Sequence, residues 1–301
     1  MSRHLLDLDD LSASELSDVL DLSEQVDLGR PLAGRGVALL FEKPSTRTRH
    51  STEMAVVQLG GHPAYVRADE VGIDERETAE DVARTLACYH ATTCARVFDH
   101  TRLTRMAAAS PVPVVNLLSD LAHPVQALAD LLTIRQELGR LAGVTLAWVG
   151  DWSNVARSLC FGAALCGLHV RVAAPDGYGP TEPDLERLVL AGAASVDAAH
   201  RAADAVKGAD VVVTDAWYSM GQESEAQARR RAFEGFGVDA ALMSGAASTA
   251  IFLHCLPAHR GEEVASEVLE GPHSRVWAEA TNRMHTMRGL LAWLARQPGR
   301  P

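Results

Sequence analysis

The feature that most constrains the fold is a regular alternation of short apolar runs with longer amphipathic segments, which begins near residue 30. The apolar runs have the length of buried strands, and the segments between them repeat apolar residues at the spacing of a helix face. Strands that alternate with helices form parallel sheets covered by helices. The pattern therefore predicts an α/β fold built from parallel sheets.

The expected elements follow from this alternation. Strands are predicted at 37–41, 64–66, 94–98, 112–117, 145–150, 170–174, 210–214, 251–255 and 276–278. Helices are predicted at 12–25, 46–59, 77–90, 124–138, 155–166 and 183–191, with a final apolar-faced segment at 285–296.

The length of 301 residues suits two domains of about 150 residues each. The alternation pauses at the helix 124–138 and the short turn after it, which places a first domain at 1–135 and a second at 136–284. The segment 285–301 is expected to pack back onto the first domain through its apolar face. Ligands of open α/β sheets bind at the carboxyl ends of the strands. We therefore expect the active site in a cleft between the two domains.

Composition excludes several classes of function. The net charge of −11 argues against a nucleic-acid partner, and no apolar stretch is long enough for a membrane span. The first residues lack the basic start and apolar run of a signal peptide. Five irregularly spaced cysteines without a CxxC pair indicate reduced thiols rather than disulfides or a zinc site. These observations predict a cytoplasmic protein.

A basic cluster follows the first predicted strand and contains Lys43, one of only two lysines in the chain. Hydroxyls and guanidiniums come next, and Ser45 or Thr46 is placed to cap the following helix. The N-terminus of a helix binds anions, and Arg47 can hold two phosphate oxygens. Two interpretations stay open on these residues alone, a phosphate site or a capped helix with a solvated basic turn. Arginines in a first turn oppose the helix dipole, which disfavours the second.

The run Ser45-Thr46-Arg47-Thr48, with Arg49 and Glu53 after it, resembles the carbamoyl phosphate signature of the aspartate and ornithine carbamoyltransferases. The resemblance covers nearly the whole chain. Further matching segments occur in the family's order: Leu59-Gly60-Gly61, Arg96-Val97-Phe98, His123-Pro124-Val125-Gln126, His254-Cys255-Leu256-Pro257 and Asn282-Arg283-Met284-His285.

The resemblance implies roles on the carbamoyl phosphate side. The phosphate would be held by Ser45, Thr46, Arg47 and Thr48. Arg96 would bridge the phosphate and the carbonyl oxygen, His123 would donate to that oxygen, and Gln126 would accept from the carbamoyl NH2. Cys255 and Leu256 would lie near the reacting carbonyl. Catalysis is assigned to Arg96, His123, Cys255 and Arg283, and no metal or cofactor is required. Taken alone, an arginine at a strand end or a histidine before proline is more often an ordinary surface or turn residue.

The acceptor side is implied by the segment that starts at Asp215 and contains Ser219-Met220-Gly221. It resembles the loop of ornithine-specific members. Asp215 would pair with the α-ammonium group, Asn154 would bind the amino-acid backbone groups, and Ser219 and Met220 would close over the substrate. The family's reaction moves a carbamoyl group to the ornithine side-chain amine, giving citrulline and phosphate for arginine biosynthesis. A homotrimer, or an assembly of trimers, is implied as well.

Several positions depart from the family pattern. Trp152 and Ser153 stand where a small residue and an Asn are usual, and Gly72 stands where relatives often have a Gln that reaches a neighbouring subunit. Three alternatives remain: a carbamoyltransferase for another amine (acetylornithine, putrescine or a specialised acceptor), a nucleotide-binding oxidoreductase, and a non-catalytic paralogue. The oxidoreductase lacks support because no GxGxxG fingerprint is present at Gly150.

Overall fold

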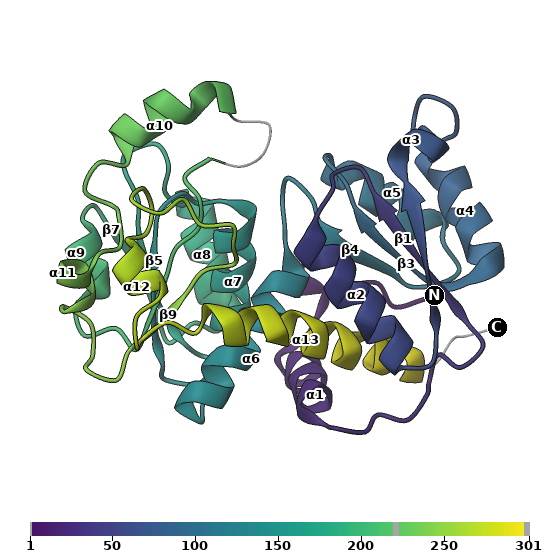
Figure 1. The fold of residues 1–301 in the computed structure, drawn as a ribbon, viewed down its shortest axis with the longest axis horizontal. Helices are drawn as coiled ribbons and strands as arrows, with labels where there is room; N and C mark the ends of the chain where they lie inside the picture. Colours follow the sequence, from purple (N-terminus) through teal and green to yellow (C-terminus); the bar gives the residue numbers. More distant parts are fainter. Residues whose placement is uncertain (1, 219–222, 298–301) are drawn as a thin grey trace. The chain divides into compact units, whose positions relative to one another are not determined.

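The computed structural model describes residues 2–218 and 223–297, and it contains two compact units (Figure 1). Unit 1 consists of Met1–Ala129 and Thr281–Pro301, and unit 2 consists of Asp130–Ala280. Among the described residues, no helix combines the length and the apolar character needed to cross a membrane. The predicted fold class, two parallel sheets flanked by helices, is confirmed.

The sheet of unit 1 has four parallel strands in the order β2-β1-β3-β4. Its strands are β1 (Gly36–Phe41), β2 (His62–Arg67), β3 (His90–Arg96) and β4 (Val114–Leu118). The helices between them are α2 (Thr46–Gln58), α3 (Ala68–Val71), α4 (Ala79–Tyr89) and α5 (His100–Ala109). One apolar cluster joins α4 and α5 to the sheet, with Val82, Leu103 and Met106 packed near Leu40 and Ala95. This packing fixes the strand ends that carry the polar residues described below.

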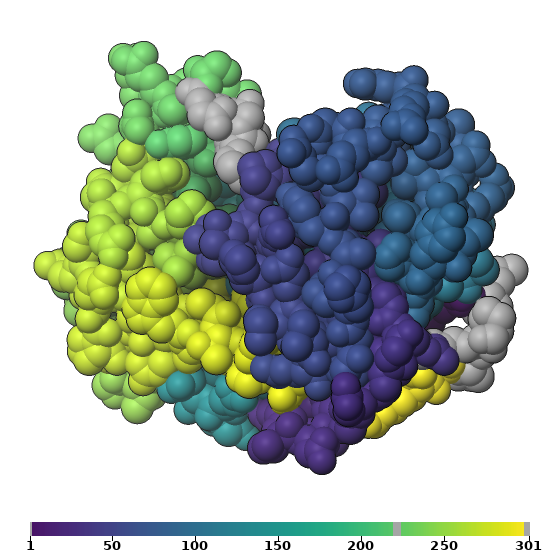
Figure 2. Space-filling model, turned by 45° about the vertical axis from the view of Figure 1, so that its right-hand side comes forward, coloured from purple at the N-terminus to yellow at the C-terminus, as the bar shows by residue number. Residues whose placement is uncertain are grey.

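The two ends of the chain lie together in unit 1. The first helices are η1 (Leu8–Asp10) and α1 (Ala13–Glu24), and the last helix is α13 (Val276–Arg296). The yellow end of α13 lies beside the purple N-terminal residues in Figures 1 and 2. The approach is close at Gly289, where an added Cβ would lie 2.2 Å from Ser23 Oγ and 2.8 Å from the Val19 carbonyl oxygen. Glycine is therefore required for α13 to reach α1.

The sheet of unit 2 has five parallel strands in the order β7-β6-β5-β8-β9. They are β5 (Thr145–Val149), β6 (His169–Ala173), β7 (Ser195–Ala199), β8 (Val211–Val213) and β9 (Ile251–Leu253). The larger helices are α6 (Pro124–Leu138), α7 (Asn154–Leu165), α8 (Glu182–Ala191) and α10 (Ala226–Ala232). Short helices are α9 (Ala202–Val206), η2 (Glu223–Glu225), α11 (Ala240–Met243) and α12 (Ser266–Leu269).

The sequence-based assignment differs from the structure at several elements, including α5 and the short helices, which it did not predict. The strand predicted at 276–278 is wrong, because these residues form the first turn of α13. A short apolar run does not distinguish a buried strand from a helix start. The strand β7 was missed because it is the edge strand and its side chains are only partly buried, so it lacks a continuous apolar run.

The close approach at Gly289 generates a stability prediction. Gly289→Ala should lower the free energy of unfolding by about 2 kcal/mol, because the new methyl group overpacks the contact with α1. This loss outweighs the roughly 1 kcal/mol that alanine gains over glycine within a helix. The urea midpoint of the variant checks it. Gly179→Ala is the control, since its new Cβ would meet Ala174 at an ordinary 3.6 Å. Equal midpoints for Gly289→Ala and the wild type would contradict the packing argument.

Candidate functional site

The segment between β1 and α2 has the geometry of an anion site. Ser45 is the N-cap of α2, in extended conformation, and its hydroxyl accepts a hydrogen bond from Thr48 N at 3.3 Å. The first turn contains no acidic residue, and Arg47 is exposed there. Free backbone N–H groups and the positive end of the helix dipole therefore act together with these side chains. Of the two caps that the sequence allowed, Ser45 and Thr46, the structure has Ser45.

Three segments that are distant in the sequence meet at the hydroxyl of Thr48. Thr48 Oγ1 accepts from Arg96 Nη1 at 3.4 Å and from Arg283 Nη2 at 3.0 Å. Arg96 is the last residue of β3, and Arg283 belongs to α13. Both guanidiniums are about 95% buried, with exposed fractions of 6% and 5%. Unit 1 thus holds two buried positive charges at the start of α2.

His123 and Gln126 join the same group from the start of α6. Arg283 Nη1 donates to Gln126 Oε1, and Gln126 N donates to the His123 carbonyl oxygen at 3.0 Å. Both side chains are buried. Burial lowers the pKa of His123 well below its usual value, and the charges of Arg283 and Arg96 lower it further. The imidazole is therefore neutral at pH 7, with one N–H to donate and one nitrogen to accept.

This group can stabilise negative charge that develops on an oxygen atom. Its donors are two guanidiniums and a hydroxyl, fixed in place by buried partners. Preorganised donors in a site protected from water lower the energy of charged transition states more than mobile donors do. A phosphate or an activated carbonyl compound fits this arrangement.

A second polar group lies at the carboxyl ends of neighbouring strands in unit 2. Asp215 follows β8 and Cys255 follows β9, and Cys255 Sγ donates to Asp215 Oδ1 at 3.1 Å. Burial raises the pKa of the Cys255 thiol well above its usual value, and the charges of Asp215 and Glu279 raise it further. Cys255 is therefore a protonated thiol that donates a hydrogen bond, and a thiolate nucleophile is excluded at neutral pH.

The turn that carries Cys255 is held by two buried acids that the sequence did not reveal. The ring of His254 makes two contacts: Nδ1 accepts from Leu256 N at 2.9 Å, and Nε2 lies 3.1 Å from Glu263 Oε1. The backbone N–H of His254 donates to Glu279 Oε2 at 2.9 Å. Leu256 adopts a left-handed φ of 57°. Glu263 and Glu279 occur in ordinary charged stretches, so only the folded partners identify them as buried supports of this turn.

Two groups of potential metal ligands occur in the described part of unit 2. In the first, of Asp215, His254 and Cys255, both ring nitrogens of His254 already bond to Leu256 N and Glu263. In the second, of His259, Glu262 and Glu263, Glu262 pairs with Arg230 at 2.8 Å. A metal would have to displace the partners of His254 in the first group, whereas in the second group His259 Nδ1, Glu262 Oε2 and Glu263 Oε2 are buried and have no hydrogen-bond partner among the described residues.

The remaining predicted acceptor residues lie around the end of β5 or outside the described residues. Asn154 is the first residue of α7, and Ser153 caps this helix by accepting from Ala156 N at 3.3 Å. Beside them, Trp152 Nε1 is buried and has no hydrogen-bond partner within residues 2–218 and 223–297. Ser219 and Met220 lie outside the described residues.

Both halves of the chain match models of one family. Residues 3–136 match the carbamoyl-P binding domain of aspartate/ornithine carbamoyltransferase, and residues 142–294 match its Asp/Orn binding domain. These two matches cover nearly all of the sequence.

Relatives and solved structures agree over the full length. The chain is 50% identical to an ornithine carbamoyltransferase of Acidothermus cellulolyticus, over 99% of this chain and 98% of the relative. The crystal structure of ornithine carbamoyltransferase from Thermus thermophilus has a TM-score of 0.90 at 44% identity, covering 98% of this chain and all of that one. The enzyme from Pyrococcus furiosus has a TM-score of 0.92 at 42% identity, covering 97% and 96%.

A structure of N-acetyl-L-ornithine transcarbamylase is also similar, with a TM-score of 0.86 at 28% identity, covering 97% of this chain and 99% of that one. Two family models that together span the chain, and relatives of this identity and coverage, establish its family. The chain belongs to the aspartate/ornithine carbamoyltransferase family.

Proposed function

We propose that this protein is a transferase that moves the carbamoyl group of carbamoyl phosphate to the side-chain amine of L-ornithine, giving L-citrulline and phosphate. The observation that carries this proposal is the convergence of Arg96 and Arg283 on the Thr48 hydroxyl, with Gln126 accepting a hydrogen bond from Arg283. In this proposal unit 1 binds carbamoyl phosphate and unit 2 binds ornithine. The names of the relatives that are 46–50% identical favour ornithine as the acceptor.

The phosphate of carbamoyl phosphate binds at the first turn of α2. Ser45, Thr46 and Thr48 donate hydrogen bonds, and Arg47 supplies a guanidinium that is exposed in the structure. Arg96 reaches both the phosphate and the carbonyl oxygen. The positive charge of these residues offsets the negative charge of the dianion and orients its carbonyl carbon for attack.

The reaction is an addition followed by an elimination. The neutral amine attacks the carbonyl carbon, and the new C–N bond places negative charge on the carbonyl oxygen, where His123 and Arg96 donate hydrogen bonds. Gln126 accepts from the carbamoyl NH2 and holds its plane. The C–O bond to phosphate then breaks, phosphate leaves with the electron pair, and the amine passes its proton to the leaving phosphate. Arg283 stabilises the charge that grows on the leaving phosphate.

The acceptor is held by unit 2. Asp215 pairs with the α-ammonium group of ornithine, and Asn154 binds its backbone groups. The thiol of Cys255 and the adjacent Leu256 lie next to the side-chain amine, where a protonated thiol can accept or donate a hydrogen bond without carrying charge. Ser219 and Met220 are assigned to the closing loop by family resemblance.

The cellular setting is part of the same proposal. We propose a cytoplasmic enzyme of arginine biosynthesis that assembles as a homotrimer or a larger assembly of trimers. Unit 1 exposes the large apolar side chains Met54, Val57, Tyr89 and Phe98, which suits a surface that a second subunit covers. The mass of the assembly in solution, measured by light scattering, tests this proposal.

A panel of amines tests the acceptor. With carbamoyl phosphate present, ornithine should give citrulline and an equal amount of phosphate, because both products come from one transfer. Acetylornithine, putrescine, lysine and aspartate serve as competing acceptors in the same assay. Faster turnover of one of these would preserve the carbamoyl phosphate site and refute ornithine as the acceptor. No turnover with any amine would favour a non-catalytic binding protein.

One observation favours keeping a second acceptor class. The buried indole N–H of Trp152 has no hydrogen-bond partner in the described part of the chain, and it stands beside Asn154. A buried donor of this kind can bind an oxygen of the ligand. An acylated amine such as acetylornithine offers one such oxygen and the ornithine carboxylate offers another. The panel of amines distinguishes acetylornithine from ornithine as the acceptor.

The role of Arg283 generates a second prediction. Arg283→Gln should lower kcat by roughly 100-fold or more, because it removes a fixed donor that stabilises transition-state charge. Arg288→Gln is the matched control on the same helix, where Arg288 Nη2 donates to the Gln25 carbonyl oxygen at 2.6 Å. Steady-state kinetics with both substrates decide it. A kcat for Arg283→Gln equal to that of the control would remove Arg283 from the mechanism.

The buried state of His123 makes folding stability depend on pH. The pKa of His123 is lowered in the folded protein, so below about pH 6.5 the unfolded chain binds a proton that the folded chain does not. Stability should therefore fall as the pH falls through this value. Between pH 7.5 and 5.5 the wild type should lose about 1.4 kcal/mol more than His123→Asn.

Urea unfolding at both pH values measures this difference. His200→Asn is the control, because the His200 side chain is exposed and it should keep the pH dependence of the wild type. An identical pH dependence in the wild type and His123→Asn would show that the folded protein protonates His123 readily.

A further inference from the structure

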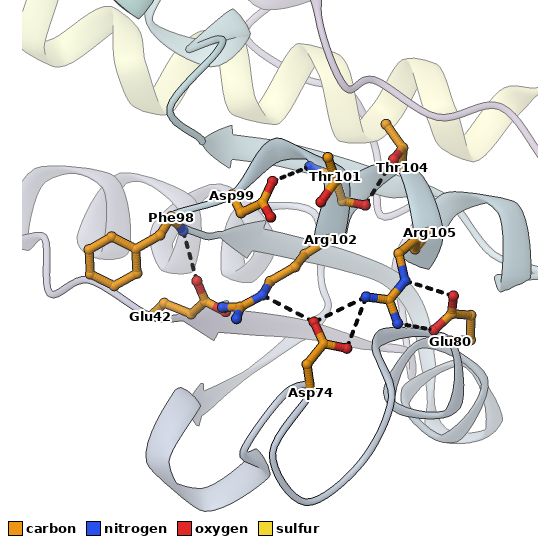
Figure 3. A network of polar contacts seen from close by, with 9 residues as sticks. All are labelled: Glu42, Asp74, Glu80, Phe98, Asp99, Thr101, Arg102, Thr104 and Arg105. Atoms are coloured by element: carbon orange, nitrogen blue, oxygen red, sulfur yellow. Dashed lines mark hydrogen bonds and ion pairs between the residues drawn. The ribbon is translucent and has the colours of Figure 1, made fainter.

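Glu42 connects two segments that carry the proposed phosphate ligands. It stands immediately after β1, and its N–H donates to the carbonyl oxygen of Arg96 at 2.9 Å. Its carboxylate Oε2 accepts from Phe98 N at 2.7 Å (Figure 3). The backbone and the side chain of Glu42 therefore join the end of β1 to the end of β3. Lys43 follows Glu42 directly, and its ammonium lies 4.1 Å from the centre of the Phe98 ring.

The charge of Glu42 is matched by a guanidinium from α5. Arg102 Nη1 donates to Glu42 Oε1 at 2.7 Å, and the Glu42 side chain is only 5% exposed. A carboxylate this buried is screened little by salt. Without Arg102 it would stand as an uncompensated negative charge in the loop that leads to the phosphate-binding turn.

The same arginine extends to the segment 72–78. Arg102 Nε donates to Asp74 Oδ2 at 3.3 Å, and Arg105 Nη1 lies 2.9 Å from Asp74 Oδ1. Arg105 also donates two hydrogen bonds to the Glu80 carboxylate, from Nε at 2.8 Å and from Nη2 at 2.6 Å (Figure 3). Two arginines on one face of α5 thus link Glu42 to Asp74 and to the start of α4.

Asp74 needs these partners because its backbone is strained. Its φ is 62°, which is unusual for a residue other than glycine. Gly72, two residues earlier, has a φ of 61°. The Asp74 N–H donates to the Glu77 carbonyl oxygen at 2.7 Å. The ion pairs of Asp74 with Arg102 and Arg105 hold this conformation, so the shape of segment 72–78 depends on charges that also touch Glu42.

Two members of the network, Glu80 and Arg102, stay charged at neutral pH. Hydrogen bonding to Arg105 lowers the pKa of Glu80 to about 2. Burial lowers the pKa of Arg102, but its interactions with Glu42 and Asp74 outweigh that effect and raise the pKa overall.

We propose that Glu42 is a positioning residue for carbamoyl phosphate, that Arg102 neutralises it, and that Arg102 and Asp74 couple phosphate binding to segment 72–78. The proposal rests on the function proposed above. Loss of Arg102 leaves a buried negative charge that disfavours a bound dianion. Loss of both charges removes that repulsion. The two substitutions are therefore expected to compensate each other, which a purely structural role would not produce.

Steady-state kinetics and titration with inorganic phosphate test the charge argument. Arg102→Gln should raise KM for carbamoyl phosphate and Kd for phosphate by about tenfold. A larger effect is not expected, because the Arg102 side chain is partly exposed to solvent. KM for ornithine should stay unchanged. The double variant E42Q/R102Q should bind phosphate more tightly than Arg102→Gln alone, and Arg102→Lys, which keeps the charge, should stay near the wild type.

Arg84→Gln is the matched control, because Arg84 forms an exposed ion pair with Asp81 on α4. It should leave every constant unchanged. Equal phosphate affinity in the wild type and Arg102→Gln would overturn the proposal, and so would a double variant weaker than Arg102→Gln. If Arg102→Gln does not fold, Glu42→Gln and Arg102→Lys carry the test. Tighter phosphate binding in the first, where the Arg102 charge stands unopposed, with wild-type binding in the second, supports the proposal, and any other result overturns it.

Hydrogen exchange tests the coupling to segment 72–78. Phosphate should slow amide exchange across residues 72–78 in the wild type and in Arg84→Gln, and should have less effect in Arg102→Gln. Absence of protection in the wild type would refute the coupling. Turnover by the wild type is measured alongside. If it fails, the proposed function is wrong, and the phosphate titration still decides the role of Glu42.

Discussion

The arrangement of unit 1 depends on a single hydroxyl that accepts hydrogen bonds from two buried guanidiniums. Thr48 lies in the first turn of α2, Arg96 at the end of β3 and Arg283 on α13. Two like charges this deep repel each other and lose hydration, so the arrangement is costly unless an anion completes it. Burial, together with their charges, keeps His123 neutral, which leaves an N–H to donate. In the proposed function, the dianion of carbamoyl phosphate supplies the missing negative charge.

The second unit uses the opposite electrostatics. Asp215, Glu263 and Glu279 concentrate negative charge behind the end of the sheet, and burial together with the charges of Asp215 and Glu279 keeps Cys255 a neutral thiol. A cationic amino acid is complementary to this negative charge, as a phosphate is complementary to the positive charge in unit 1. The division of charge between the units therefore parallels the division of labour between donor and acceptor.

Much of the fold and of the candidate site could be predicted from the sequence, and the reason is physical. Buried parallel strands are read as continuous apolar runs, and polar residues directly after them mark the edge where ligands bind. Motif resemblance identified Arg96, His123 and Arg283, which alone look ordinary. The supporting acids could not be predicted. Glu42, Glu263 and Glu279 become distinctive only through partners from other elements, and β7 lacks a run because it lies at the sheet edge.

The return of α13 to unit 1 has a consequence for the order of events during synthesis. Unit 1 is assembled from both ends of the chain, and Arg283 is translated after all of unit 2. The phosphate cluster can therefore gain its second guanidinium only after all of unit 2 has been synthesised. The nascent chain carries α1 without its partner helix until then. Unit 2 is continuous in sequence, so its sheet needs no segment from a distant part of the chain, whereas unit 1 cannot be completed without its last helix.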